Sequence, residues 1–282
     1  MEKEKFIEEY RAYMEMRGYS YTTIRNYLYI LRDFLKRFSL PDEDAVQAYF
    51  WEKNGIKKNS RATQVRIFRS FGKFIRRRYN LDFRLPEAPR TGKMLPVFLS
   101  KGEVAKLLHA ARNNTRDFAI LSFIIYTGVR VSELTNILID DVDFVSNTVR
   151  VLGKGEKERI IPITSDLGNL LKSYLKERGS RSRYLFVSKY GQKLTPLSVQ
   201  LIVKKYASKA HLSKHITPHK LRHTFATLAL ESGVNPITIS ELLGHSSLNT
   251  TMKYTHVTNK LTEDAVRRVA DLTDFKDILK GR

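Results

Sequence analysis

Residues 217–223 read TPHKLRH, and this short stretch decides how the rest of the chain is interpreted. Thr217 followed by Pro218 is typical of a helix start, because threonine caps free N–H groups and proline suits the first helical position. His219 and Arg222 then lie on one face of the first turns. The free N–H groups and the dipole of that helix end favour an anion, and a guanidinium and an imidazole add charged donors. The stretch therefore predicts a phosphate-binding pocket.

A zinc site is the alternative interpretation of the same stretch, because His219 and His223 are four residues apart. Lys220 follows the first histidine, where the metalloprotease pattern has glutamate, and the Lys and Arg of this turn would repel a metal ion. We therefore expect no metal site. His223 is expected to be a structural histidine, in contrast to His219.

The charge of the chain points to a polyanionic partner. Its 282 residues include 50 Lys and Arg against 29 Asp and Glu, a net charge of +21, and the pI is near 10.0. Such a surplus favours nucleic acid, because every phosphate that is neutralised releases counterions. A basic protein without such a partner and an anionic membrane surface are the alternatives, but neither end has a polybasic amphipathic anchor.

Cysteine is absent, which excludes disulfides, a thiolate nucleophile and cysteine-bound zinc. The first ten residues, MEKEKFIEEY, are too acidic for a signal peptide. The longest uncharged apolar stretch, residues 118–126, is too short to span a bilayer. We expect a soluble cytoplasmic protein that does not bind membranes.

The first part of the chain predicts a four-helix domain over residues 1–86. The apolar spacing gives helices at about 2–17, 22–38, 42–51 and, with a cap at Asn59-Ser60, through about residue 78. The fourth helix carries a basic series beside an apolar stripe: Arg61, Arg66, Arg69, Lys73 and Arg76. Such a series can be only a solvated face, but nearly all of its charge has one sign, which favours contact with a DNA backbone.

Residues 87–97 are predicted to be a linker, since prolines and a glycine separate two periodic regions. The second domain, 98–282, is predicted to be mostly helical. Its expected helices are 100–111, a buried one at 118–126, two that start at 195–196 and 217–218, and a C-terminal one at 261–280. Alternating residues at 148–152 and 159–163 predict a β-hairpin with a basic, glycine-flanked tip. The predicted fold class is mainly α with one small sheet or hairpin.

Five motifs in order carry a family resemblance. They are TGVRVSEL at 127–134, GKG at 153–155, HKLRH at 219–223, LGH at 243–245, and Tyr254. Their order and spacing resemble the tyrosine recombinase (phage integrase) family, and the short chain looks most like its Xer branch. The resemblance implies that the four-helix part is a core-binding domain and that the second domain is catalytic.

The chemistry that these residues suit is phosphodiester transfer. This reaction needs a nucleophile, positive charge on the non-bridging oxygens and an acid for the leaving oxygen. Tyr254 would attack the phosphate, while Arg130 and Arg222 would grip its two non-bridging oxygens. Tyrosine ionises near pH 10, so its proton must pass to a base, for which His219 is the candidate.

Three further residues complete the predicted site. Lys154, on the hairpin tip, is the candidate general acid for the departing 5′ hydroxyl. His245 is expected to donate a hydrogen bond to the phosphoryl group. Glu133 is expected to orient Arg130 or His219 rather than to react.

The resemblance also implies the reaction product and the partners. It implies a 3′-phosphotyrosyl link with a free 5′ hydroxyl, no cofactor, no ATP, and site-specific recombination that resolves chromosome dimers. The implied partner is double-stranded DNA with paired inverted half-sites. The implied assembly is a tetramer on two DNA sites, joined through the C-terminal helix; the alternative is that this helix packs on its own domain. The competing possibilities are an integrase of a mobile element, a type IB topoisomerase, an inactive DNA-binding protein and a metal-dependent nuclease.

Overall fold

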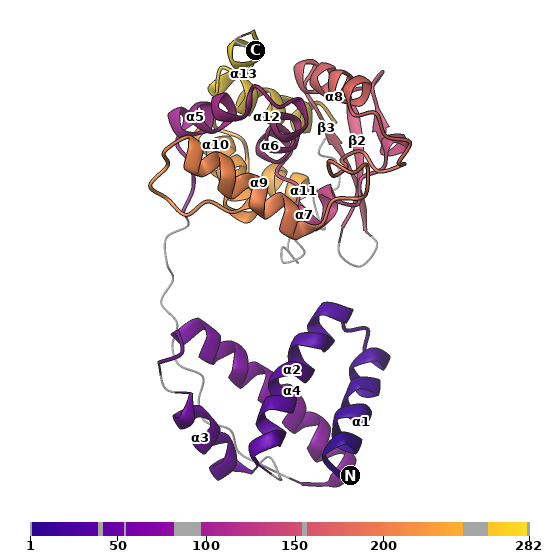
Figure 1. The fold of residues 1–282 in the computed structure, drawn as a ribbon, viewed down its shortest axis with the longest axis vertical. Helices are drawn as coiled ribbons and strands as arrows, with labels where there is room; N and C mark the ends of the chain where they lie inside the picture. Colours follow the sequence, from indigo (N-terminus) through magenta and orange to yellow (C-terminus); the bar gives the residue numbers. More distant parts are fainter. Residues whose placement is uncertain are drawn as a thin grey trace. The chain divides into compact units, whose positions relative to one another are not determined.

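The computed structural model describes residues 2–38, 42–53, 55–81, 97–153, 157–244 and 259–280. The chain divides into two compact units, Met1–Met94 and Leu95–Arg282. This division falls within the segment 87–97, of which all but residue 97 lies outside the described residues. In the described part the first unit is helical, and the second adds one small sheet to its helices (Figure 1). The predicted fold class is confirmed.

Four helices form the first unit: α1 (Glu2–Met16), α2 (Tyr21–Arg37), α3 (Glu43–Glu52) and α4 (Lys58–Tyr79). Aromatic side chains hold them together. The Phe34 ring of α2 meets the rings of Tyr49 and Phe68 edge-on, with centroids 5.5 and 5.0 Å away. Tyr10 of α1 meets Phe71 of α4 in the same way at 5.0 Å. Such pairs favour one arrangement of the helices beyond the gain from burial alone.

Short polar side chains start two of these helices. Ser20 accepts from the backbone N–H of Thr23 at the start of α2, and Asp42 accepts from that of Ala45 at the start of α3. The predicted cap of α4 at Asn59-Ser60 is wrong. The carbonyl of Lys57 already accepts from the N–H groups of Ser60 and Arg61, so helical bonding begins earlier, without a side-chain cap.

The second unit is built around α6 (Thr115–Thr127), which contacts α5, α8, α9, α10 and α12. Residues 117–127 of α6 are all buried, as the apolar stretch predicted. No helix in the described ranges is long and apolar enough to cross a membrane. The other helices of this unit within the described residues 97–153 and 157–244 are α5 (Lys101–Ala111), α7 (Val131–Leu134), a 3-10 helix (Ile139–Asp141), α8 (Ser165–Glu177), α9 (Pro196–Lys209), α10 (Pro218–Glu231) and α11 (Pro236–Leu243).

The sheet has three antiparallel strands in chain order: β1 (Val142–Asp143), β2 (Thr148–Leu152) and β3 (Glu158–Pro162). It lies beside α8 at one side of the unit (Figure 1). Val149 pairs with Ile161 and faces the core, whereas Arg150 pairs with Ile160 on the exposed side. The two long strands match the predicted hairpin. The two-residue β1 was not predicted.

The C-terminal segment forms two helices, α12 (Asn259–Leu272) and α13 (Phe275–Lys280), where the sequence predicted one over 261–280. The chain turns at Asp274, whose φ of +50° is left-handed. The turn is anchored in the core, because the hydroxyl of Thr273 lies 2.7 Å from that of the buried Tyr126.

Candidate active site

Arg222 lies on the second turn of α10, and the predicted helix start holds it there. Thr217 caps the helix by accepting from the N–H of Lys220, and Pro218 occupies the first turn. The Arg222 side chain is only 4% exposed. Its Nη1 donates to the carbonyl of Gly128 at 2.8 Å, and its Nη2 donates to that of Leu243 at 2.6 Å. The guanidinium is therefore fixed by main-chain acceptors from two other segments.

Gly128 allows α6 to end close beside this arginine. Its φ of +64° is left-handed, and a Cβ at this position would lie 2.5 Å from Leu243 Cδ2 and 2.6 Å from Phe225 Cδ1. Only glycine fits such a position without a shift of the core. The tight turn places Arg130 two residues later, beside α7.

Glu133 joins the arginines. Its side chain is 4% exposed, and its Oε2 accepts from the backbone N–H of Arg130 at 2.8 Å. Its Oε1 accepts from Arg130 Nη1 at 2.7 Å. Arg159 of β3 grips both carboxylate oxygens, at 3.1 and 2.7 Å, and Arg222 Nη1 is 4.0 Å from Oε2. Glu133 thus contacts Arg130, one of the two groups that it was predicted to orient.

The C-terminal end of α11 provides the other fixed partners. Three consecutive carbonyls accept from three arginines: Leu242 from Arg159 Nε at 2.8 Å, Leu243 from Arg222 Nη2 at 2.6 Å, and Gly244 from Arg130 Nη2 at 2.9 Å. The last carbonyls of a helix lack helical partners and carry the negative end of the dipole. The end of α11 is therefore suited to hold cations close together.

These four side chains, Arg130, Glu133, Arg159 and Arg222, form what we call the arginine cluster. Three guanidiniums face one carboxylate. The carboxylate neutralises one positive charge, so the cluster keeps a net charge of about +2. Mutual repulsion and burial make such an arrangement costly unless an anion joins it. The excess positive charge therefore suits the cluster to bind an anion, such as a phosphate group.

Burial also affects the pKa values of two members of the cluster, Arg222 and Glu133. Burial, and next the repulsion from Arg130, lower the pKa of Arg222 to about 10. Burial alone would raise the pKa of Glu133, but hydrogen bonds from Arg159 and from the backbone of Arg130 outweigh it and keep that pKa below its usual value. Both groups stay charged at neutral pH.

His219 and His223 face each other on successive turns of α10. Their Nε2 atoms are 3.1 Å apart, and the rings meet edge-on with centroids 4.5 Å apart. A bond between two imidazole nitrogens needs one donor and one acceptor, so at least one ring is neutral. Burial, followed by repulsion from His219 and from Arg222, lowers the pKa of His223. His223 therefore takes up a proton less readily than an ordinary histidine does.

The lowered pKa of His223 predicts that the folded protein loses stability on acidification, at a pH well above the range in which Glu133 titrates. Because the pKa of His223 is lowered in the folded state, the unfolded chain takes up its proton first as the pH falls. The stabilising contribution is complete above the ordinary pKa of 6.5 and is lost as the pH falls below it. We expect the urea midpoint to drop between about pH 7.5 and about pH 5.5, and to drop less in His223→Gln. An equal drop in both proteins would contradict the assignment.

Three predicted catalytic residues, Lys154, His245 and Tyr254, lie outside the described residues. Their described neighbours in the sequence are Gly153 and Gly244. A Cβ on Gly153 would lie 3.6 Å from Arg159 Nη1 and 3.8 Å from Glu133 Oε1, and a Cβ on Gly244 would lie 3.2 Å from Arg159 Nη1. The residues that precede Lys154 and His245 therefore both lie against the arginine cluster.

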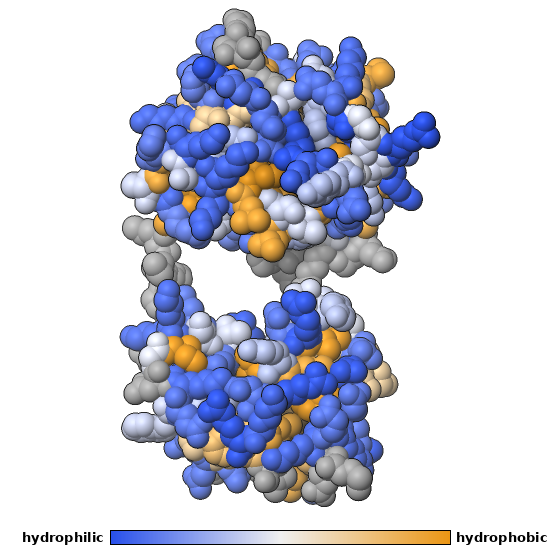
Figure 2. Space-filling model, in the orientation of Figure 1, coloured by the Kyte–Doolittle hydropathy of each residue, from blue (hydrophilic) through white to orange (hydrophobic). Residues whose placement is uncertain are grey.

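The basic series of α4 divides into two groups. Arg66, Arg69, Lys73 and Arg76 are exposed along one side of the helix. Arg61 instead lies over the Phe50 ring at 4.7 Å and donates to the carbonyl of Lys53. Its role in the fold was not evident from sequence, because spacing along one helix does not reveal contacts with another. Hydrophilic side chains cover much of the visible face of each unit (Figure 2).

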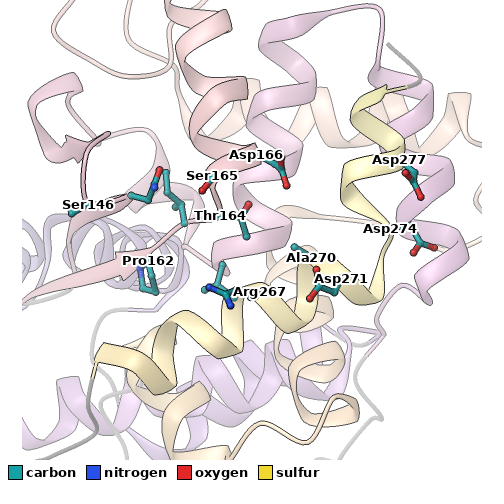
Figure 3. A pocket seen from close by; sticks show the side chains of 13 residues that line it. Ser146, Pro162, Thr164, Ser165, Asp166, Arg267, Ala270, Asp271, Asp274 and Asp277 are labelled. Atoms are coloured by element: carbon teal, nitrogen blue, oxygen red, sulfur yellow. The ribbon is translucent and has the colours of Figure 1, made fainter.

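A cavity of about 730 Å³ lies elsewhere in the second unit, between the β2–β3 region, the start of α8 and α12–α13. Asp271, Asp274 and Asp277 line one side, across from Ser165 and Asp166 (Figure 3). The arginine cluster does not line this cavity. In the described part of the chain no group of three or more His, Asp or Glu side chains is placed to hold a metal ion.

Arg159 is the member of the arginine cluster that sequence reasoning missed. It sits on β3 opposite Val151, and its side chain is 13% exposed. An inward-facing arginine in a strand next to a glycine-rich tip was the available signal, since buried charges need partners.

Known proteins resemble this chain both in sequence and in structure. Residues 97–260 match the model of the phage integrase family. The tyrosine recombinase XerA of Pyrococcus horikoshii is 40% identical over 270 residues, covering 93% of this chain and 92% of that protein. A crystal structure of XerA recombinase matches 95% of this chain and 97% of its own, with 31% identity and a TM-score of 0.52. A post-cleavage complex of XerH with palindromic difH DNA matches 88% of this chain and 80% of its own, with 25% identity and a TM-score of 0.69. The chain belongs to the phage integrase family of tyrosine recombinases.

Proposed function

We propose that this protein is a site-specific recombinase that cleaves and rejoins DNA through a 3′-phosphotyrosyl intermediate. The observation that carries the proposal is the arginine cluster, in which Arg130 and Arg222 are fixed by the main-chain carbonyls of Gly244, Leu243 and Gly128. A cation pair held before the substrate arrives stabilises the charge that develops on the non-bridging oxygens and needs little reorganisation.

The proposed reaction balances without a cofactor. The phenolic oxygen of Tyr254 attacks the phosphorus, its proton passes to His219, and the bond from phosphorus to the 5′ oxygen breaks. Lys154 gives a proton to the departing 5′ oxygen, and His245 donates a hydrogen bond to the phosphoryl group. Rejoining is the reverse reaction with a different 5′ hydroxyl, so the phosphotyrosyl ester conserves the bond and no ATP is used.

His219 can act as the base because of its neighbour. Its Nε2 lies 3.1 Å from that of His223, and the lowered pKa of His223 favours the neutral form of that ring. A neutral imidazole can accept a hydrogen bond from His219 or donate one to it, and thereby fix its ring.

The experiment that tests the proposal is detection of the covalent intermediate. Purified protein is incubated with nicked duplexes tiled across the host chromosome, in the presence of a chelator. With a nick near the scissile phosphate, cleavage releases a short fragment that carries the free 5′ hydroxyl. Loss of this fragment prevents rejoining and traps the intermediate. We expect an SDS-resistant adduct whose DNA is attached to the tryptic peptide 254–260. Attachment elsewhere, or cleavage only with divalent metal, would refute the mechanism.

We further propose that the first unit holds the DNA through the exposed side of α4. Arg66, Arg69 and Lys73 recur at spacings of three and four residues and are exposed. Contacts with the phosphate backbone give affinity without sequence information. The bound DNA carries paired inverted half-sites.

Salt dependence provides the measurement for this surface. Replacing Arg66, Arg69 and Lys73 by glutamine is expected to weaken binding to all DNA sequences and to reduce the slope of log K against log salt by about 0.9 for each phosphate that is no longer neutralised. Arg11→Gln is the matched control, because Arg11 already pairs with Glu8 on α1 at 3.3 Å. An unchanged slope in the triple variant would exclude α4 from the interface.

The biological role that we propose is resolution of chromosome dimers. It is supported by the Xer names of the relatives, among them XerA at 40% identity. Four copies would act on two DNA sites, joined through the C-terminal helices. Recombination of a plasmid with two directly repeated target sites into two circles would distinguish this role from relaxation of one duplex.

A further inference from the structure

Arg159 connects three parts of the second unit that are far apart in sequence. Its Nε donates to the Leu242 carbonyl at the end of α11, and its two Nη atoms donate to both oxygens of Glu133. It belongs to β3 and is therefore part of the β2–β3 hairpin. The side chain is largely buried, with 13% exposed.

The hairpin rests on this arginine close to its tip. Gly153 directly follows β2, and its N–H donates to the carbonyl of Lys157 at 2.8 Å. A Cβ at Gly153 would lie 3.6 Å from Arg159 Nη1 and 3.8 Å from Glu133 Oε1. The chain therefore passes directly over the Arg159–Glu133 pair immediately before Lys154.

We propose that Arg159 is a positioning residue that holds the end of β2 and the start of β3 against the arginine cluster, and that the step assigned to Lys154 depends on it. The inference rests on the proposed function, because it takes Lys154 as the general acid. The planar guanidinium of Arg159 donates to three acceptor atoms, the Leu242 carbonyl of α11 and both oxygens of Glu133 in α7. The single ammonium of lysine cannot make the same three bonds. Its contacts are with Glu133 and α11, so its expected effect on the reaction is through the hairpin.

Loss of Arg159 should affect the hairpin more than the phosphate grip. Arg130 keeps its own two bonds to Glu133, at 2.8 and 2.7 Å, and Arg222 keeps its bonds to two carbonyls. The hairpin, by contrast, loses all three of the Arg159 bonds. A misplacement of about 1 Å at a reacting group costs roughly 100-fold in rate.

The test separates protonation of the leaving group from the other steps. Single-turnover cleavage is measured on a nicked duplex with either oxygen or sulfur at the 5′ bridging position. A thiol has a pKa of about 8.5, far below that of an alcohol, so the sulfur leaves without a general acid. We expect Arg159→Lys and Arg159→Gln to cleave the oxygen substrate roughly 100-fold more slowly and to regain most of that loss on the sulfur substrate.

Two controls interpret the result. Lys154→Ala should show the same pattern as the Arg159 variants. Arg150→Gln should cleave both substrates at the wild-type rate, because Arg150 is on the same hairpin but faces outward and pairs with Asp141 and Glu158. If sulfur does not restore Lys154→Ala, the proposed role of Lys154 fails, and this inference fails with it.

The inference alone is overturned if sulfur restores Lys154→Ala but not the Arg159 variants, or if those variants cleave the oxygen substrate at the wild-type rate. Gly153→Ala covers the case in which the Arg159 variants do not fold. Its Cβ would lie 3.1 Å from the Lys157 carbonyl, so the two ends of the hairpin tip must move apart by a few tenths of an ångström while the Arg159 side chain is unchanged. It should also be slow on oxygen and restored on sulfur; a rate near wild type on oxygen, or no restoration, would overturn the inference.

Discussion

Tyr254→Phe is expected to abolish cleavage and the covalent adduct while DNA binding stays unchanged. The proposed nucleophile is the phenolic oxygen of Tyr254. The substitution removes the atom that forms the bond to phosphorus. Loss of a nucleophile commonly lowers a rate by roughly 10⁴-fold or more, to the level of positioning and charge stabilisation alone. Affinity should persist, because the arginine cluster and α4 are untouched.

Adduct formation on a nicked duplex and binding by gel shift, measured side by side, check this result. Tyr190→Phe is the matched control, since it removes the same hydroxyl from an exposed tyrosine of the second unit, 77% exposed. Adduct formation by Tyr254→Phe at more than about one hundredth of the wild-type rate would exclude Tyr254 as the nucleophile. Loss of DNA binding would mean that Tyr254 has a structural role.

Glu133→Ala is expected to lower the free energy of unfolding by about 3–5 kcal/mol, the usual cost of removing one partner from a buried ion pair. Glu133 is 4% exposed and accepts from Arg130 and Arg159. Without the carboxylate, three guanidiniums would share a small buried region with only carbonyl partners. Cleavage should also fall, because Arg130 loses the group that orients it.

Urea unfolding at about pH 7.5 measures this effect, with Glu158→Ala as the matched control. Glu158 is on the same sheet, but it is 57% exposed and lies 3.5 Å from Arg150, so its removal should cost less than about 1 kcal/mol. If both variants lost the same free energy of unfolding, the buried Glu133 ion pairs would contribute no more to stability than the exposed pair of Glu158. Sulfate should stabilise Glu133→Ala more than wild type, since an anion can replace the missing charge.

Local signals in the sequence predicted the helices and their ends well where one residue acts on its immediate neighbours. Thr217 with Pro218 starts α10, and Ser100 with Glu103 forms a capping box at α5. The apolar stretch at 118–126 became the buried centre of the second unit. The start of α4 was misplaced, because the backbone of Lys57 began the helix without the side-chain signal that was sought.

The contacts of the site could be predicted only in part. Motifs identified Arg130, Glu133 and Arg222, but not that the last carbonyls of α11 hold two of them. Arg159 and Leu242 are 83 residues apart, and Arg130 and Gly244 are 114 apart. Contacts at such separations depend on how helices pack, and periodicity within one helix does not encode that packing. The break at Thr273-Asp274 was missed for the same reason, since the distant Tyr126 anchors it.

The end of α11 has a consequence for how this protein can vary. Its three arginine partners are bound by main-chain carbonyls, which every amino acid supplies. Substitution at Leu242 or Leu243 therefore cannot delete an acceptor; it changes only apolar packing, in which both side chains are almost fully buried. Methionine or isoleucine should serve at either position with small losses. The carbonyl acceptors are thus insensitive to the side chains at Leu242 and Leu243, whereas Gly244, with its φ of +61° and an added Cβ 3.2 Å from Arg159 Nη1, cannot be replaced without strain.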